Sequence, residues 1–236
     1  MNTSKSPIIF FVLVFALSTP LSLAGTAVHL ELAPGIPMSA IVVTFCPLIA
    51  ALILVYRENK TAGMIELLKR AFDFKRIKAK VWYAPLILIM PGVMTLEYLV
   101  LRSMGSPIPV PQFSIWMPLV IFTTTFIAAL GEELGWMGYA IDPMLEGSNA
   151  LSAAILLGVA WAAWHLIPLV QEGRSLTWIA WWGLASVAQR VIIVWLYNNT
   201  GKSVFVAAFY HAMMNLTWQL FPVNGSFYDP RITGLL

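Results

Sequence analysis

Long apolar runs recur along this chain between short polar segments, and they constrain its fold more than any other feature. A membrane-spanning helix needs about 20 mostly apolar residues, because a rise of about 1.5 Å per residue must cover about 30 Å of hydrocarbon. The 236 residues are 59% hydrophobic and 11% charged, whereas soluble domains carry about 25% charged residues. This composition excludes an ordinary soluble domain and indicates an integral membrane protein.

The number of apolar runs predicts an all-α fold, a polytopic transmembrane helix bundle of about seven spans within a single domain, 1–236. The first run, 1–26, is interpreted as a span; the alternative is a signal peptide cleaved near Ala24. The fourth run begins near Trp116 and is expected to end at Asp142-Pro143. The remaining predicted spans are 38–56, 81–103, 150–170, 176–197 and 203–221.

The segment 57–80 holds 8 of the 14 Lys and Arg residues. Within it an apolar stripe that includes Leu67, Leu68 and Phe72 faces away from Lys69 and Arg70, which predicts a short interfacial helix in the headgroup plane. A solvated basic loop is the alternative. The positive-inside rule places this segment in the cytoplasm, with membrane lipids as partners. No nucleic-acid partner is expected, because the basic residues gather in one loop between spans.

Two adjacent carboxylates, Glu132 and Glu133, follow the apolar run that begins at Trp116. Charged side chains inside a membrane are costly and are usually functional. The fifth span contains His165, and the seventh contains His211 with Asn215 one helical turn later, on the same face. Helical rise places these residues at different depths, so the sequence permits a cluster of Glu132, Glu133, His165, His211 and Asn215 but does not require one.

Such a cluster would suit peptide hydrolysis. A desolvated Glu132 can act as a general base toward water, and His165 can share that water or protonate the leaving amine. His211 and Asn215 can donate hydrogen bonds to an oxyanion. The alternatives are a zinc site formed by Glu132, His165 and His211, or polar residues that only bond between helices. Glu97, in the third span, is expected to have a structural role.

Three motifs made of these residues resemble the CAAX-prenyl protease and bacteriocin-processing (CPBP, Abi) family of intramembrane proteases. The family's Glu-Glu-x-x-x-Arg reads Glu132-Glu133-Leu134-Gly135-Trp136-Met137 here. An aromatic-x-x-x-His follows as Trp161 to His165, and His-x-x-x-Asn is matched by His211 to Asn215. The resemblance covers most of 38–220, so the protease-like core is taken as about 38–221.

The resemblance implies an intramembrane endopeptidase that opens toward the cytosol and acts on a hydrophobic or lipid-modified peptide. It assigns Glu132 as the base, with Glu133 beside it, His165 as a helper in activating water, and His211 with Asn215 as the oxyanion site. It implies a glutamate mechanism without a cofactor, with zinc as the alternative. The expected location is a bacterial or archaeal plasma membrane.

The chain departs from the family pattern in two places. Met137 stands where the family has Arg, and a methionine cannot donate to a carboxylate. Arg190, in the sixth span, is a candidate replacement; alternatively, it extends to the nearby membrane face. No clear eighth span is visible. The missing Arg leaves a second hypothesis open, a non-catalytic immunity or scaffold protein that binds peptides in the same groove.

Overall fold

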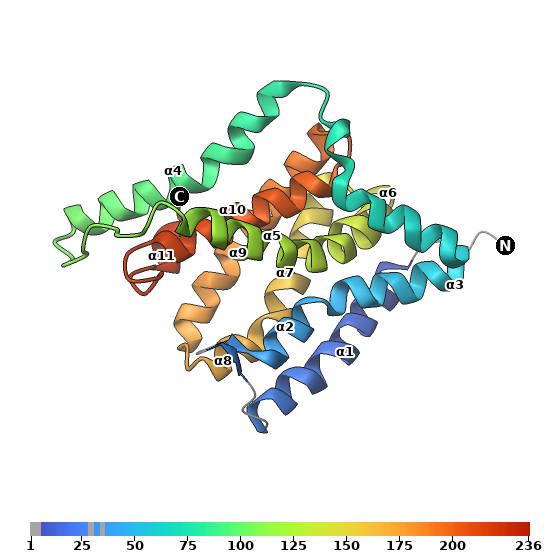
Figure 1. The fold of residues 1–236 in the computed structure, drawn as a ribbon, viewed down its shortest axis with the longest axis horizontal. Helices are drawn as coiled ribbons and strands as arrows, with labels where there is room; N and C mark the ends of the chain where they lie inside the picture. Colours follow the sequence, from blue (N-terminus) through green and yellow to red (C-terminus); the bar gives the residue numbers. More distant parts are fainter. Residues whose placement is uncertain (1–5, 28–30, 34–35) are drawn as a thin grey trace.

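The computed structural model describes residues 6–27, 31–33 and 36–236, and in this part the fold is helical apart from one short two-stranded ribbon (Figure 1). The elements are α1 (Pro7–Ala27), β1 (Glu31–Ala33), β2 (Ile36–Pro37), α2 (Met38–Thr44), α3 (Cys46–Lys69), η1 (Arg70–Arg76), η2 (Lys80–Trp82), α4 (Tyr83–Ser103), α5 (Met117–Gly135), η3 (Trp136–Ala140), α6 (Ile141–Gly147), α7 (Ala150–Trp164), α8 (Leu166–Gln171), α9 (Leu176–Asn199), α10 (Val204–Leu220) and α11 (Pro230–Thr233).

Five helical stretches in the described part are long and apolar enough to cross a membrane: Pro7–Gly25, Lys80–Ser103, Met117–Gly147, Ala150–Gln171 and Leu176–Asn199. The all-helical membrane fold is therefore confirmed, but the count of seven spans is not. Of the other two predicted spans, 38–56 is divided between α2 and α3, and 203–221 forms α10, which has 17 residues.

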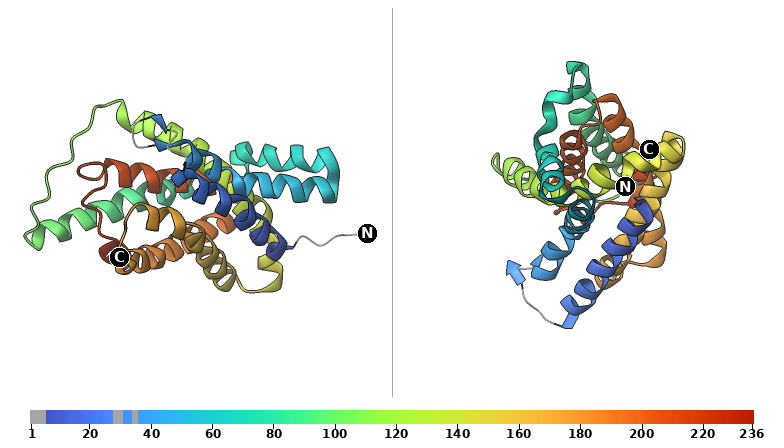
Figure 2. Two further views of the ribbon diagram at one scale, coloured as in Figure 1. Left: turned by 90° about the horizontal axis from the view of Figure 1, so that it is seen from below. Right: turned by 90° about the vertical axis from the view of Figure 1, so that its right-hand side faces the viewer.

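The N-terminal helix α1 packs beside α2 and α3 (Figures 1 and 2). Phe10 and Val14 are fully buried on its inner face. The Phe10 ring contacts Trp136 and Tyr139, with centroids 5.3 and 5.5 Å apart. Burial of such aromatic surface is a large apolar contribution to packing. Residues 7–27 thus form part of the bundle around the following helices.

The predicted short helix of the basic segment follows a sharp break in α3. Lys60 has φ 55° and ψ −155°, so the helix stops and restarts there. The second run turns back beside the first in Figure 1, and a Cβ on Gly63 would lie 2.6 Å from the Cβ of Asn59. Leu68 and Phe72 are exposed, while Leu67 is buried. Arg70 was expected on the polar face of this helix, but it points into the protein, where Nη1 and Nη2 donate to groups on other elements.

The centre of the bundle is α5, which packs against α3 and α10, with α7 packed against α9 nearby. Gly131 and Gly135 allow the close approach of α5 to the start of α3. A Cβ on Gly135 would lie 2.5 Å from the Pro47 carbonyl oxygen, and one on Gly131 would lie 2.7 Å from the Phe45 ring. Small residues four apart let helices in membranes approach closely. This contact fixes the position of Glu132 and Glu133.

The chain does not break at Asp142-Pro143 as the sequence predicts. The π-helical turn η3 connects α5 to α6, and the helical path continues to Gly147. The change of register places Pro143 in the first turn of α6, where its missing N–H costs little. Single π-helical turns inside α-helices are frequent at functional sites.

Glu97 on α4 holds the C-terminal segment, as its predicted structural role requires. It is fully buried and accepts hydrogen bonds from the Asp229 backbone N–H at 2.7 Å and from the Thr233 hydroxyl at 2.8 Å. These bonds fasten α11 beside α4 and α9. The extended connection between α4 and α5 lies at the edge of the molecule (Figure 2).

Candidate active site

A cavity of about 240 Å³ lies between α4, α5, α7, α8, α9 and α10. Four of the five residues singled out from the sequence line it: Glu132, His165, His211 and Asn215. Depths calculated from helical rise did not predict that these four residues lie together, since that calculation assumed straight spans. His165 ends α7 and begins α8, so the chain bends at this histidine.

Glu132 is held by Trp161 across the cavity wall. The Trp161 Nε1–H donates to Glu132 Oε2 at 2.7 Å, and Glu132 is 7% exposed. Within the described residues, no hydrogen bond reaches the other carboxylate oxygen, Oε1. The aromatic residue of the second motif therefore orients the first carboxylate, and one oxygen remains for a molecule in the cavity.

Glu133 lies behind the cavity and bridges two other helices. Its Oε2 accepts from Arg190 Nη1 on α9 at 2.6 Å, and its Oε1 lies 2.8 Å from His211 Nδ1 on α10. Glu133 and Arg190 are fully buried. Because adjacent helical residues project about 100° apart, one carboxylate faces the cavity and its neighbour faces the bundle. This interaction fixes His211 Nδ1, so Nε2 is the ring nitrogen available to the cavity.

Arg190 supplies a positive charge beside Glu133, which Met137 cannot do. It does not extend to the membrane face, because it is fully buried and paired with Glu133. Its guanidinium carbon lies 4.7 Å from the Trp161 ring centroid, and a cation over an aromatic face is attracted to it. Its Nε and Nη2 have no hydrogen-bond partner among the described residues. The ion pair with Glu133 and the stacking on Trp161 link Arg190 to both glutamates.

His165 is enclosed by aromatic rings. Its Nδ1 lies 2.9 Å from the Trp161 carbonyl oxygen, and its ring centroid lies 4.6 Å from Trp161, 4.7 Å from Trp164 and 5.2 Å from Trp182. The carbonyl fixes one nitrogen, which directs the opposite edge of the ring away from α7. Asn215, one turn beyond His211, brings an amide to the same cavity.

The zinc alternative can be compared with this donor set. Among the described residues, no group of three or more His, Cys, Asp or Glu side chains is arranged to hold a metal ion. Glu132 and His211 each have one donor atom engaged, with Trp161 and Glu133 respectively. Glu132, His165 and His211 are therefore not among the groups arranged to hold a metal ion in the described residues, and the zinc alternative stays a prediction.

Known proteins are similar to this chain over the segment that carries the four candidate residues of the cavity. Residues 114–217 match the sequence model of type II CAAX prenyl endopeptidase Rce1-like proteins. The chain is also similar to CAAX prenyl protease 2 of Methanococcus maripaludis, with 30% identity over 210 residues that cover 80% of this chain and 74% of the relative. The chain belongs to the CAAX prenyl protease family. The recognition made from the three motifs is confirmed, and the apolar helices make this member an integral membrane protein.

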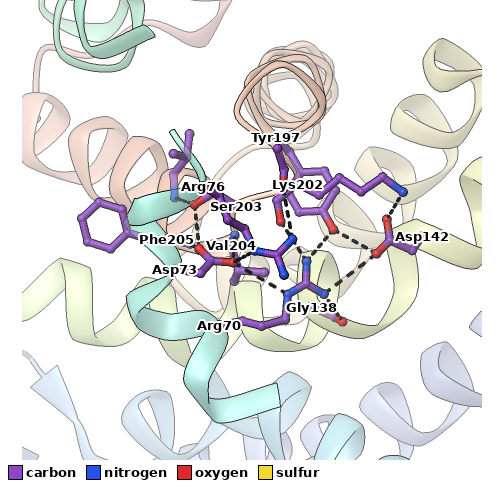
Figure 3. A network of polar contacts seen from close by, with 12 residues as sticks. Arg70, Asp73, Arg76, Gly138, Asp142, Tyr197, Lys202, Ser203, Val204 and Phe205 are labelled. Carbon is purple, nitrogen blue, oxygen red and sulfur yellow. Dashed lines mark hydrogen bonds and ion pairs between the residues drawn. The ribbon is translucent and has the colours of Figure 1, made fainter. Parts of the chain in front are cut away.

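A second polar cluster, the Arg70 network, joins η1 to other elements of this CAAX protease family member (Figure 3). Arg70 donates to the Gly138 carbonyl at 2.8 Å, the Tyr197 hydroxyl at 2.6 Å and the Lys202 carbonyl at 3.0 Å. Asp142 pairs with Lys202 at 2.9 Å. Asp73 accepts from the Ser203 hydroxyl and from the first backbone N–H groups of α10. The network ties η1 to the ends of α9 and α10.

The cavity and the Arg70 network lie toward opposite ends of α9. Arg174 precedes α9 and Lys202 follows it, and 24 helical residues rise about 36 Å. The exposed residues that line the cavity are Glu172 and Arg174, so the cavity extends toward the end away from the basic segment. In this family member the exposed part of the cavity lining therefore lies on the side opposite the basic segment, and the membrane side of each stays a prediction.

Two residues of the cavity were missed as functional candidates. Trp161 was interpreted only as the aromatic residue of a motif, and Arg174 was not singled out. A tryptophan N–H that reaches a carboxylate on another span leaves no signal in the sequence, because the two residues are 29 apart. Arg174 and Trp178 are four residues apart in the sequence, and cation–aromatic spacing of this kind is too common to mark a site by itself.

Proposed function

We propose that this family member is an active intramembrane endopeptidase that hydrolyses a peptide bond in a hydrophobic or lipid-modified peptide through a water activated by Glu132. The observation that carries the proposal is that Glu132, His165, His211 and Asn215 line one cavity between apolar helices. The family membership supports peptidase chemistry, and the cavity supplies a site where water and a peptide carbonyl could meet.

The reaction assigns one task to each residue. Glu132 takes a proton from water while the water oxygen bonds to the scissile carbonyl carbon. His211, protonated on both ring nitrogens so that Nδ1–H donates to Glu133 and Nε2–H is free to donate, forms the oxyanion site together with the Asn215 amide. The proton then passes from Glu132, assisted by His165, to the leaving nitrogen. The C–N bond breaks, which leaves a carboxylate on one product and an amine on the other.

Glu133 and Arg190 act as positioning residues in this scheme. Glu133 fixes Nδ1 of His211 at 2.8 Å, and Arg190 supplies the cation that pairs with Glu133 at 2.6 Å. A carboxylate that accepts from one ring nitrogen sets the orientation of the histidine ring and holds a proton on that nitrogen. The pair supports an active enzyme despite Met137, which otherwise favours a non-catalytic immunity or scaffold protein.

The proposed substrate is a prenylated peptide that ends in a CAAX-type sequence, and hydrolysis would release its last three residues. The cavity suits such a chain because it is lined by apolar and aromatic side chains, among them Met90, Leu169 and Trp182. The proposed setting is a bacterial or archaeal plasma membrane, with the basic segment 57–80 in the cytoplasm and lipid headgroups around it.

Purified protein in lipid nanodiscs, given an internally quenched prenylated peptide, tests the function directly. Wild type is expected to cleave at one bond, identified by the masses of the products. Glu132→Gln is expected to lose at least about 10²-fold in kcat, since general-base catalysis contributes 10²–10⁴. Glu146→Gln, a change of the same type at an exposed position, is the matched control.

The same assay separates the alternatives. Loss of activity with a chelator and recovery with zinc would replace the glutamate mechanism with a metal-dependent one. No cleavage by folded wild type, together with peptide binding, would favour the non-catalytic protein. Equal rates for Glu132→Gln and wild type would overturn the assignment of the base.

A further inference from the structure

One cation stands out in the cavity. Of the described residues that line it, Arg174 is the only one with a permanent positive charge. It lies at the exposed end, whereas Glu132 and His211 are buried at the other. A lone cation at the mouth of a largely apolar and aromatic cavity would attract an anionic group on a bound chain.

Neighbouring groups position Arg174 without engaging all of its guanidinium. Its guanidinium carbon lies 4.6 Å from the Trp178 ring centroid, and its Nε lies 3.4 Å from Glu172 Oε2. Among the described residues, neither terminal nitrogen of Arg174 has a hydrogen-bond partner. Two parallel N–H groups are therefore available, which is the arrangement that binds a carboxylate in bidentate fashion.

The length of the cavity matches a short peptide. Its wall along α9 runs from Gln189 to Trp178, a distance of about 16 Å at helical rise. Gln189 marks the buried end, because it accepts from Tyr210, the residue before His211, at 2.7 Å. Three extended residues span about 10–11 Å. The difference is a few Å, which the side chains of Glu132 and Arg174 can cover.

We propose that Arg174 binds the free C-terminal carboxylate of the substrate and so places the bond three residues from the end next to Glu132. This proposal rests on the proposed function for its substrate class. A terminal carboxylate at the mouth would face the free edge of Arg174. Glu172, on the Nε side, would oppose it by charge repulsion. Arg174 thereby measures the distance from chain end to scissile bond and selects against peptides that lack a terminal charge.

Binding measured on Glu132→Gln protein in nanodiscs tests the proposal without any need for cleavage. Two fluorescent prenylated peptides are compared, identical except for a free C-terminal carboxylate or a C-terminal amide. The free acid is expected to bind about tenfold or more tightly, the effect of charge-assisted hydrogen bonds. Adding Arg174→Gln should bring the ratio of the two Kd values close to one, and Glu172→Gln should raise it.

Arg231→Gln is the control, because Arg231 is an exposed cation near the same end but does not line the cavity, and it should leave the Kd ratio unchanged. Three results would overturn the Arg174 site. The first is a Kd ratio near one in the protein that keeps Arg174, and the second is a Kd ratio that is unchanged by Arg174→Gln. The third is no binding of either peptide. Wild type that binds the free acid selectively but cleaves nothing would instead defeat the proposed function and keep the carboxylate site.

Discussion

The molecule contains two polar clusters whose ion pairs are similar but whose surroundings differ. The Arg70 network joins backbone carbonyls, a tyrosine and two aspartates, and it fastens the ends of several helices. The cavity cluster consists of Glu132 and His211 in the cavity lining and of Glu133 and Arg190 behind them; Arg190 pairs with Glu133, and Glu133 contacts His211. In the network, most polar atoms are used within the protein. In the cavity lining, Glu132 and His211 each have one polar atom engaged within the protein, Oε2 and Nδ1 respectively, and no hydrogen bond among the described residues reaches Glu132 Oε1 or His211 Nε2. Such atoms are the ones expected to act on a substrate.

This difference separates two reasons for placing charge inside a membrane protein. Breaking a buried ion pair by removing one partner is strongly destabilising, because the other charge is left uncompensated. Both clusters would therefore matter for folding. Only the cavity cluster is expected to change kcat on protein that remains folded. Substitutions in each cluster can distinguish an effect on folding from an effect on kcat.

Arg190→Met should produce the largest combined loss. It leaves Glu133 buried without its cation, a cost of about 3–5 kcal/mol in stability, and it frees His211 to rotate. We expect a fall in Tm and at least a tenfold fall in kcat on the folded fraction. Thermal unfolding and cleavage rates on the same preparation measure both.

The double variant Met137→Arg with Arg190→Met is the informative partner for that test. Position 137 is one helical turn from Glu133, so an arginine there can reach the same carboxylate. Recovery of kcat in the double variant would support the replacement of one arginine by the other. Arg190→Met protein that is folded and fully active would contradict the positioning role.

Arg70→Gln should destabilise the protein without changing its chemistry. It removes the donors to Gly138, Tyr197 and Lys202 and the ion pairs with Asp73 and Asp142, a loss on the order of 2–4 kcal/mol. We expect a lower Tm and an unchanged kcat on folded protein. Arg76→Gln, at a side chain that is 51% exposed, should shift Tm far less. A large fall in kcat for Arg70→Gln with an unchanged Tm would contradict a purely structural role for the Arg70 network.

The placement of the two clusters relative to the membrane can be tested with little effect on activity. Cys46 is the only cysteine, so a Cys46→Ala background allows single cysteines at exposed Lys75 and Arg231. If the basic segment is cytoplasmic, an impermeant thiol reagent added to intact cells should label Arg231→Cys and leave Lys75→Cys unlabelled until the cells are opened. The reverse pattern would place the cavity end in the cytoplasm.

Much of this architecture could be predicted from the sequence, because long apolar runs and buried charges have few solutions in a membrane. The all-helical fold, the helix after Lys60 and the role of Glu97 follow from composition and burial cost. The path beyond Asp142-Pro143 could not be predicted, since a π-helical turn depends on packing around Trp136. The inward course of Arg70 was missed because its partners, such as Gly138 and Lys202, lie far along the chain.

For the candidate site, the residue types indicated which side chains to consider, but the sequence did not show how they are arranged in space. Spacing alone left Glu132 and Glu133 nearly equivalent, and the structure separates them by the direction in which each projects from α5. Arg190 was recognisable as a costly charge, but its pairing with Glu133 depends on how α9 packs. The catalytic assignment of Glu132, His165, His211 and Asn215 stays a prediction.

The most direct test of the account is the ratio of kcat for Glu132→Gln to kcat for Arg70→Gln, both measured on folded protein with the same prenylated peptide. We expect a ratio of about 10⁻² or lower, with the lower Tm belonging to Arg70→Gln. A ratio near one would show that the cavity carboxylate contributes no more to the chemistry than a residue of the Arg70 network, and would contradict the central claim.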